Sequence, residues 1–155
     1  MRLQTIWVVL AASGAGVHGT DAVSTEWALR QYVDQLTDER SCQVKAKDGD
    51  ASPVFVARQN GESFVFISGA DFPSRPVQIR VDKNRALEAE GDFSPAQVAA
   101  VIKQVRGGGA QILTKSYQWP NDYPLVEEFS TTGLTAQMDE CRRWVRSTEP
   151  AAGSE

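Results

Sequence analysis

Two cysteines constrain the fold of this chain more than any other pair of residues. Cys42 lies in an early apolar segment, Cys141 lies near the C-terminal end, and the chain has no third cysteine. In an oxidising compartment an even number of cysteines indicates a disulfide bond. A Cys42–Cys141 bond would close a loop of about 100 residues and stabilise the fold by ~4–5 kcal/mol in the chain-entropy description. Two separately buried thiols are the alternative, and a two-cysteine metal site is less favoured.

The N-terminal segment favours the disulfide because it has the form of a secretory signal. Residues 1–19 have a basic start, an apolar run and a small-residue end, with Val17 and Gly19 at positions −3 and −1 of a cleavage site. The apolar run is shorter than the ~20 residues that a membrane anchor needs. We therefore expect a signal peptide over 1–19 and a periplasmic or secreted protein. The only histidine, His18, would leave with it, which excludes most imidazole chemistry.

The rest of the chain has the size of one ordinary domain. We expect a single globular domain over 20–149 and a disordered tail over 150–155. The formal net charge is −4, and charges of both signs are interspersed along the chain. Without a basic stripe the chain has no electrostatic footprint for nucleic acid. After signal removal no apolar segment is long enough to span a membrane.

Hydrophobic periodicity predicts mainly strands, with two helices. Strands are expected over 27–33, 42–47, 54–59, 62–68, 77–82, 86–90, 112–119 and 125–131. Ser94, Pro95 and Gln97 form a capping box with proline at the first helical position, and a glycine triplet ends that helix. A second helix is expected over 134–146, where Cys141 lies on the apolar stripe and therefore points inward.

The clearest turn signal is Asn60-Gly61, which suits a two-residue type I′ hairpin. That turn predicts a register pairing Ala57 with Phe64, Val56 with Val65, Phe55 with Phe66, and Val54 with Ile67. Phe55 would then share a face with Phe64 and Phe66. Because both faces of the hairpin are apolar, we expect it to be covered on both sides, at the centre of the sheet.

No arrangement of residues predicts catalysis, a cofactor or a metal ion. Lys115 and Ser116 are neighbours on a strand and point to opposite faces. Carboxylate pairs, such as Glu88 with Glu90, are read as solvated surface. The carboxylate candidates also include Asp92, Glu127, Glu128, Asp139 and Glu140. The glycine triplet follows a helix and so does not form a phosphate cradle, and Asn121-Asp122 lacks the spaced carboxylates of a calcium site.

One aromatic segment is a candidate binding loop. Tyr117, Trp119 and Tyr123 alternate with Pro120 and Pro124 in this segment. The residues 120–124 are expected to form a loop. Exposed aromatic side chains on a loop suit recognition of a peptide or a glycan. The alternative, which we favour because aromatic residues are core residues first, is that Tyr117 and Trp119 cap the core where the strand ends.

Several segments together resemble the invasion-associated locus B family of exported bacterial proteins. They are TEWALRQY, SCQVKA, the strand over 77–82, VIKQVRGGG and FSTTGLTAQMDECRRWV, which cover nearly all of 26–146. The resemblance implies a compact, mostly β protein of the periplasm or the exterior, without known catalysis. Members are linked by name to host-cell invasion or envelope function, and no catalytic residues carry over.

We therefore predict an α+β domain with an antiparallel, sandwich-like β-sheet, two packed helices and one disulfide. The first functional hypothesis is a non-enzymatic exported protein that acts through protein or envelope contacts, with a partner of unknown identity. The alternative is a periplasmic inhibitor or immunity protein that blocks a toxin or a hydrolase. A histidine-free hydrolase is the least favoured, and it would need two carboxylates converging in a deep pocket.

Overall fold

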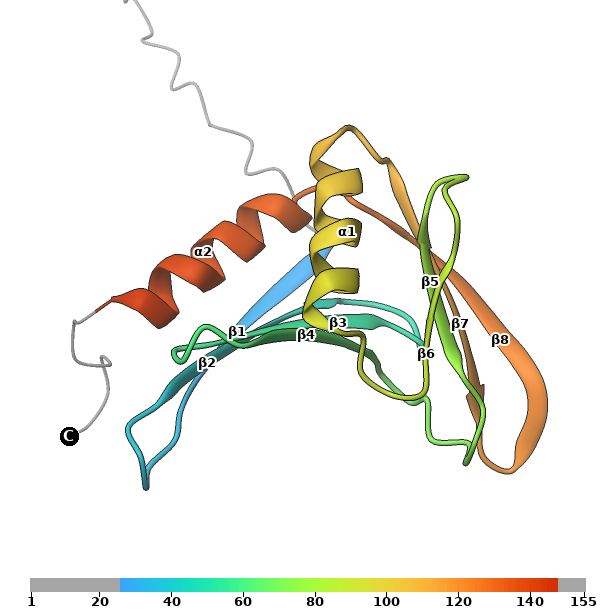
Figure 1. Cartoon of the computed structure of the whole chain (residues 1–155), viewed down its shortest axis with the longest axis horizontal. Coiled ribbons are helices and arrows are strands. Elements are labelled where there is room, and N and C mark those ends of the chain that lie inside the picture. Colours follow the sequence, from blue (N-terminus) through green and yellow to red (C-terminus); the bar gives the residue numbers. More distant parts are fainter. Residues whose placement is uncertain (1–25, 148–155) are drawn as a thin grey trace, which may run out of the picture.

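The structure, a computed structural model, describes residues 26–147 (Figure 1). The predicted signal peptide and the predicted tail lie outside the described residues. The described chain forms β1 (Trp27–Val33), β2 (Arg40–Ala46), β3 (Pro53–Arg58), β4 (Ser63–Ile67), β5 (Val77–Val81), β6 (Leu87–Ala89), α1 (Pro95–Arg106), β7 (Gln111–Gln118), β8 (Asn121–Ser130) and α2 (Leu134–Arg146).

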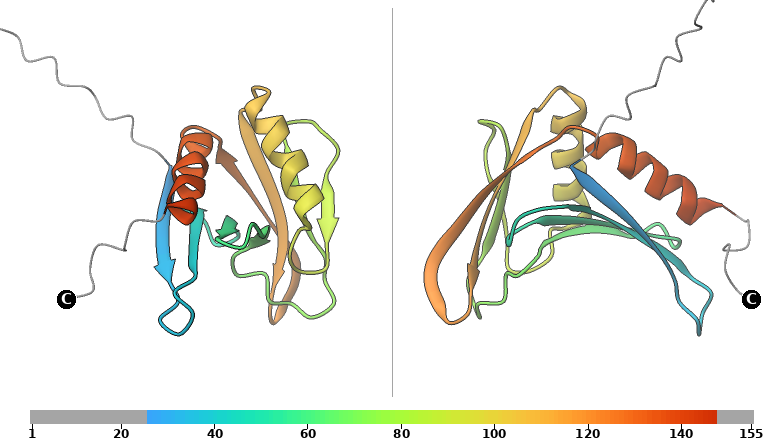
Figure 2. Two further views of the ribbon diagram at one scale, coloured as in Figure 1. Left: turned by 60° about the vertical axis from the view of Figure 1, so that its left-hand side comes forward. Right: turned by 180° about the vertical axis from the view of Figure 1, so that it is seen from behind.

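The strands form two antiparallel sheets of four strands each. The first sheet has the order β1-β2-β3-β4 and the second has the order β6-β5-β7-β8. Helix α2 packs across β1, β2 and β3, and α1 packs against β4 and β5, so both helices cover the inner side of the sheets (Figures 1 and 2). The predicted α+β fold, antiparallel and sandwich-like with two packed helices, is confirmed, and its strands divide between two sheets.

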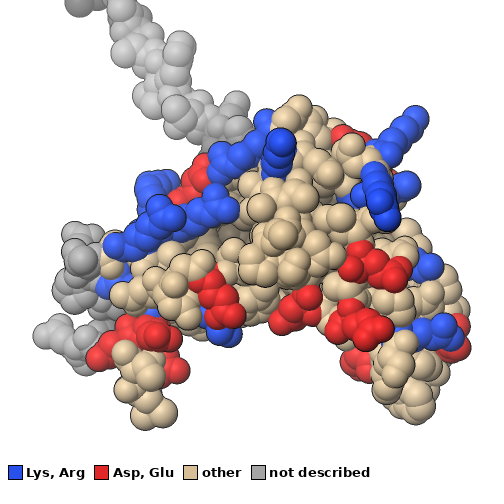
Figure 3. Space-filling model, viewed as in Figure 1, with Lys and Arg blue, Asp and Glu red and all other residues tan. Residues whose placement is uncertain are grey.

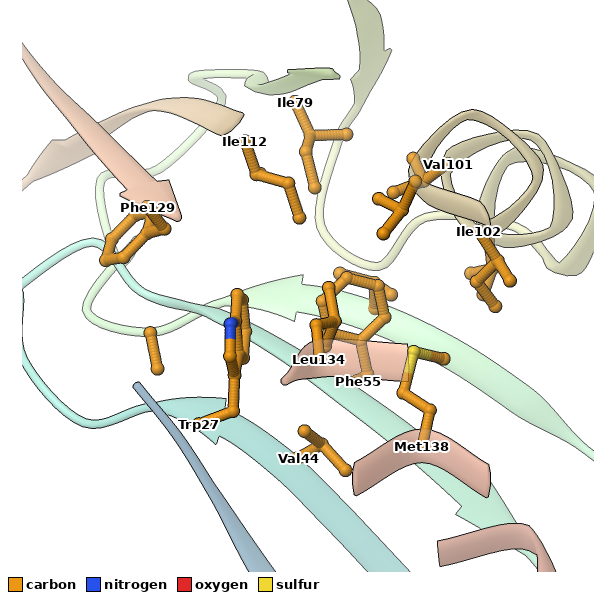
Figure 4. Packing of buried hydrophobic residues seen from close by; sticks show 14 of the residues in the cluster. Trp27, Val44, Phe55, Ile79, Val101, Ile102, Ile112, Phe129, Leu134 and Met138 are labelled. Carbon is orange, nitrogen blue, oxygen red and sulfur yellow. The ribbon is translucent and has the colours of Figure 1, made fainter. Parts of the chain in front are cut away.

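The core lies between the two sheets and the helices (Figure 4). Trp27 is at its centre, 1% exposed, with its ring centroid 5.8 Å from that of Phe55 and 6.5 Å from that of Phe129. The Trp27 Nε1–H donates to the Ser130 carbonyl at 2.9 Å. One side chain of the first sheet thereby contacts the last strand of the second, which joins the two sheets in a single core.

The two helices begin and end largely as the sequence predicts. At the start of α1 the Ser94 hydroxyl accepts from the Gln97 N–H, and the Gln97 side chain accepts from the Ser94 N–H. Helix α2 begins after Gly133, whose φ of +82° is a left-handed conformation that favours glycine. The predicted apolar stripes are buried: Val98, Val101, Ile102 and Val105 on α1, and Leu134, Met138, Cys141 and Val145 on α2.

The predicted disulfide is confirmed. Cys42 on β2 and Cys141 on α2 form the bond, with their Cα atoms 5.7 Å apart, and both side chains are buried. Near the bond, the buried Arg40 guanidinium donates to the Ser147 carbonyl at 2.7 Å and stacks on the Trp144 ring. A cation at the carboxyl end of a helix also interacts favourably with the helix dipole. The disulfide and Arg40 together fix α2 to the first sheet.

The turn between β1 and β2 is closed by Asp34. Its carboxylate accepts hydrogen bonds from the N–H groups of Leu36 at 2.8 Å and Thr37 at 3.0 Å. Because these bonds favour the charged form, first through Leu36 and then through Thr37, the pKa of Asp34 lies below its ordinary value. Leu36 at the tip of this hairpin is 95% exposed.

The predicted register of the β3–β4 hairpin is wrong by one residue. Phe55 pairs with Val65, not with Phe66. The Arg58 N–H donates to the Glu62 carbonyl at 2.9 Å, which leaves a three-residue loop ending in Gly61 at φ +88°. A turn followed by a left-handed glycine is the common form of such three-residue loops, and Asn-Gly fits it as well as it fits a two-residue turn.

This shift decides which side chains enter the core. Phe55 and Val65 point to the inner face, whereas Phe64 and Phe66 point to the outer face beside Val54 and Val56. Strand β4 is an edge of the first sheet. The prediction that Phe55 shares a face with Phe64 and Phe66 is therefore wrong, because one residue of slip exchanges the faces. The hairpin is also not central, since β4 is an edge strand. Strand β3 is buried on both faces, with Val54 2% and Val56 6% exposed on the outer one.

Replacing Gly61 tests the three-residue loop. A Cβ at this position would meet no atom within 4 Å, so only the backbone conformation resists the change. Gly61→Ala is expected to lower the free energy of unfolding by about 1–2 kcal/mol, and Gly61→Asn by less, because asparagine tolerates left-handed φ. Urea denaturation measures both variants, and equal stability of Gly61→Ala and the wild type would contradict this backbone conformation.

Candidate functional site

The predicted aromatic segment lies at the tip of the β7–β8 hairpin. Trp119 and Pro120 form the turn, with a cis peptide bond between them. Trp119 is 63% exposed and Tyr123 is 65% exposed, whereas Tyr117 is half-buried. The interpretation of Trp119 as a cap on the core is therefore wrong. The expected loop over 120–124 is also corrected, because β8 already begins at Asn121.

Trp119 is exposed but held in place by the connection between β4 and β5. Its ring centroid lies 5.3 Å from that of Phe72, with a tilt of 56° between the planes. The Trp119 N–H donates to Asp71 Oδ1 at 2.8 Å. An aromatic side chain that is already ordered pays less conformational entropy on binding than a free one. The hydrogen bond positions the Trp119 backbone, and the contact with Phe72 orients the indole on the surface.

Arg75 ties the same connection to the hairpin. Its guanidinium lies 5.2 Å from the Tyr117 ring centroid and 5.8 Å from the Phe72 ring centroid, and it pairs with the Asp122 carboxylate. The Phe72 N–H also donates to the Tyr117 carbonyl at 3.3 Å. We refer to Phe72, Tyr117, Trp119 and Tyr123 as the aromatic hairpin surface.

Phe72 and Arg75 are residues of this site that the sequence did not predict. The segment 69–76 begins with glycine and ends with proline, a composition typical of a connecting loop. An aromatic and an arginine inside such a segment are a weak signal of a contact. Their partners, Tyr117 and Asp122, are more than 40 positions away, and only the tertiary fold brings them together.

A cavity of about 460 Å³ opens beside the aromatic hairpin surface. Its aromatic wall consists of Phe66 and Phe72, and three carboxylates, those of Asp71, Glu90 and Asp92, line it together with the Arg75 guanidinium. In Figure 3 acidic side chains lie along the lower part of the visible face, whereas Lys and Arg gather over α2 and at the upper right. The oriented indole therefore lies next to a hollow with an acidic wall, an arrangement that suits contact with a polar or cationic surface.

The other candidate residues have ordinary structural surroundings. The Glu127 carboxylate accepts from the N–H groups of Asp50 at 3.1 Å and Ala51 at 2.6 Å. The Glu88 carboxylate accepts from the Gln78 side chain at 2.7 Å. Lys115 lies over the Tyr117 ring. These contacts hold loops and strands together.

Ser116 is buried on the inner face of β7, and its Oγ has no hydrogen-bond partner among the described residues. The ammonium of Lys115 lies instead at the aromatic hairpin. This placement agrees with the expectation that adjacent strand residues point to opposite faces.

Asp139 forms an ion pair with Arg106, which joins α2 to α1. Across residues 26–147, no group of three His, Cys, Asp or Glu side chains is placed to hold a metal ion. In the same part of the chain, neither helix is long and apolar enough to cross a bilayer.

Comparison with protein-family models, with curated proteins and with solved structures found no match to this chain. The resemblance to the invasion-associated locus B family therefore stays a prediction, and the surfaces described above provide the evidence about function.

Proposed function

We propose that this protein is an exported, non-enzymatic bacterial protein of the invasion-associated locus B type, which binds a protein of the cell envelope through the aromatic hairpin surface. Export is supported by the form of residues 1–19 and by the buried Cys42–Cys141 bond, because structural disulfides form in oxidising compartments. The observation that carries the binding role is the exposure of Trp119 and Tyr123 on an ordered hairpin.

An exposed tryptophan beside an exposed tyrosine is unusual on a protein surface that binds no other molecule. Tryptophan and tyrosine are enriched among the residues that dominate the energy of protein interfaces. Trp119 contributes little to the core, since it is 63% exposed, yet Phe72 and Asp71 hold it in position. The position of Trp119 is therefore better explained by a contact with another molecule than by a role in folding.

Removing these side chains is expected to affect binding and leave folding intact. Trp119→Ala and Tyr123→Ala should each change the free energy of unfolding by no more than about 1 kcal/mol, as substitutions of exposed residues do. Urea denaturation followed by circular dichroism measures this. A larger loss of stability would place the aromatic hairpin surface in the core and would remove the main support for the proposal.

The partner is tested by photo-cross-linking in the cell. A p-benzoylphenylalanine at position 123 should form a discrete adduct with one envelope protein, and Trp119→Ala in the same chain should abolish it. The same cross-linker at position 36 is the control, because Leu36 is a large hydrophobic residue, 95% exposed, at the tip of a different hairpin. No adduct at position 123, or the same adducts at both positions, would contradict the proposal.

A periplasmic inhibitor or immunity protein is the second candidate. The observation that favours it is the shape of the β7–β8 hairpin, whose aromatic tip extends from the body of the molecule (Figures 1 and 2). A projecting hairpin can enter the cleft of a hydrolase or toxin. This candidate is preferred if the adduct at position 123 contains a hydrolase whose activity falls when the purified protein is added.

A further inference from the structure

Among the described residues, strand β8 is an edge of the second sheet. Its first residues carry Tyr123 of the aromatic hairpin surface, and its C-terminal half lies beyond that surface. A cleft of about 370 Å³ runs beside it, with Trp27 and Ala46 of the first sheet on its other side. On β8 it is lined by the four consecutive residues 127–130. Because neighbouring residues of a strand point to opposite faces, a cleft that touches all four must open along the backbone edge.

The hydrogen-bond pattern identifies the backbone groups on the outer side of β8: those of Glu128 lie at the cleft, and those of Val126 lie next along the same edge, beyond its lining. The Thr131 N–H donates to the Ala110 carbonyl at 2.9 Å, and bonded pairs alternate along an antiparallel ladder. In the register of β7 and β8, Phe129 and Glu127 therefore bond to β7, while Glu128 and Val126 direct their N–H and C=O groups away from it. Within residues 26–147, the outward N–H and C=O groups of Glu128 and Val126 form no backbone hydrogen bond with a neighbouring segment.

The open part of the edge has defined ends. At one end the Trp27 indole donates to the Ser130 carbonyl, so that acceptor is occupied. At the other end Pro124 has no N–H and interrupts the row of donors. Figure 2 shows β8 passing from the hairpin tip toward the start of β1. The lining residues Glu26 and Trp27 place the cleft at that end of β8. The free backbone groups between these two ends have the length to pair with a short added strand.

The charge of the cleft selects the occupant. Among the described residues, its lining includes the carboxylates of Glu26, Asp48, Glu127 and Glu128 and no Lys or Arg. The Glu127 carboxylate also accepts from the N–H groups of Asp50 and Ala51, and that of Glu128 from the Gln111 side chain, and both keep their negative charge at the cleft. Trp27, Ala46 and Phe129 give it an apolar floor. Anionic polymers and anionic lipid surfaces are repelled by this arrangement, whereas a strand with basic side chains on one face is attracted.

We propose that the β8 edge binds an extended, positively charged peptide segment by strand addition, with the backbone of Val126 and Glu128 pairing with the peptide and the carboxylates of the cleft binding its basic side chains. Main-chain hydrogen bonds provide affinity in this mode of recognition, and alternate side chains provide specificity. The site is separate from the aromatic hairpin surface and does not depend on the function proposed for that surface.

The first test uses a synthetic probe. A fluorescein-labelled, acetylated and amidated peptide of four Lys-Thr repeats should bind the purified domain, as measured by fluorescence anisotropy, with an affinity that falls as salt is added. A peptide of four Glu-Thr repeats and a Lys-Thr peptide with N-methyl groups on alternate residues should each bind at least ten-fold more weakly. Equal binding of the three probes would overturn the proposal.

The second test blocks the edge in the protein. Glu128→Pro removes an N–H that the ladder does not use and should weaken binding of the Lys-Thr peptide at least ten-fold. Gln31→Pro is the matched control, because the Lys47 N–H bond to the Glu26 carbonyl places the exposed Gln31 N–H on the free edge of β1. Glu128→Lys keeps the N–H and tests the charge if the proline variant does not fold. Binding unchanged in Glu128→Lys or in a folded Glu128→Pro protein would overturn the proposal.

Discussion

Replacing Trp27 with alanine is expected to lower the free energy of unfolding by about 4 kcal/mol, within the range for large aromatic residues removed from a core. Trp27 is 1% exposed and contacts the rings of Phe55 and Phe129, which belong to different sheets. Its loss would leave a cavity where the two sheets meet and would leave the Ser130 carbonyl without its indole donor. The cost therefore combines lost packing with a lost hydrogen bond.

Urea denaturation monitored by circular dichroism measures this effect, with two controls. Trp27→Phe keeps an aromatic ring and should recover part of the loss, but not the hydrogen bond. Trp119→Ala removes the same side chain from an exposed position and should cost no more than about 1 kcal/mol. A Trp27→Ala protein as stable as Trp119→Ala would contradict the placement of Trp27 at the junction of the sheets.

Removing the disulfide is expected to have an effect almost as large. Cys42→Ser and Cys141→Ser should each lower the free energy of unfolding by about 3–4 kcal/mol, because the bond restrains a long loop of the unfolded chain. The two cysteines are 99 positions apart, so most of the domain lies between them. The loss should be greatest for contacts of α2 with the first sheet, which the bond joins directly.

The double variant Cys42→Ser/Cys141→Ser provides the control for this prediction. Since either single change already breaks the bond, the double variant should be nearly as stable as the single ones. Wild-type protein treated with dithiothreitol should lose a similar amount of stability. A wild-type protein whose unfolding midpoint is the same with and without reductant would contradict the stabilising role of the bond.

The parts of the fold that follow from local chemistry were predictable. The capping box of Ser94 and Gln97, the stripe that turns Cys141 inward and the disulfide itself are all present in the structure. Each depends on residues close in sequence, or on the rule that two cysteines in an oxidising compartment pair. Helix α2 illustrates this, since its bounds match the periodicity of its apolar residues.

The parts that depend on tertiary choice were not predictable. Asn60-Gly61 permits both a two-residue and a three-residue turn. Phe64 and Phe66 share one face in either register, but that face is the one with Phe55 in the first register and the opposite one in the second. Which strands share a sheet is also a non-local property, because β5 pairs with β7 across the whole of α1. Alternation of apolar residues shows that a strand is half-buried but does not show which sheet it joins.

The candidate site was predictable in one half only. Tyr117, Trp119 and Tyr123 were identified from the sequence, although burial of Trp119 was favoured over exposure. Phe72 and Arg75 complete the site from another segment, and no local pattern connects them to the hairpin. The β8 edge was missed because exposure of backbone groups depends on which strand ends the sheet.

The most direct test of this account is the intact mass of the protein recovered from the envelope of its own host. The protein is denatured without reductant and treated with iodoacetamide before mass spectrometry. We predict a chain that lacks residues 1–19 and carries no alkyl group on Cys42 or Cys141. A full-length chain from the cytosol, alkylated on both cysteines, would contradict the account.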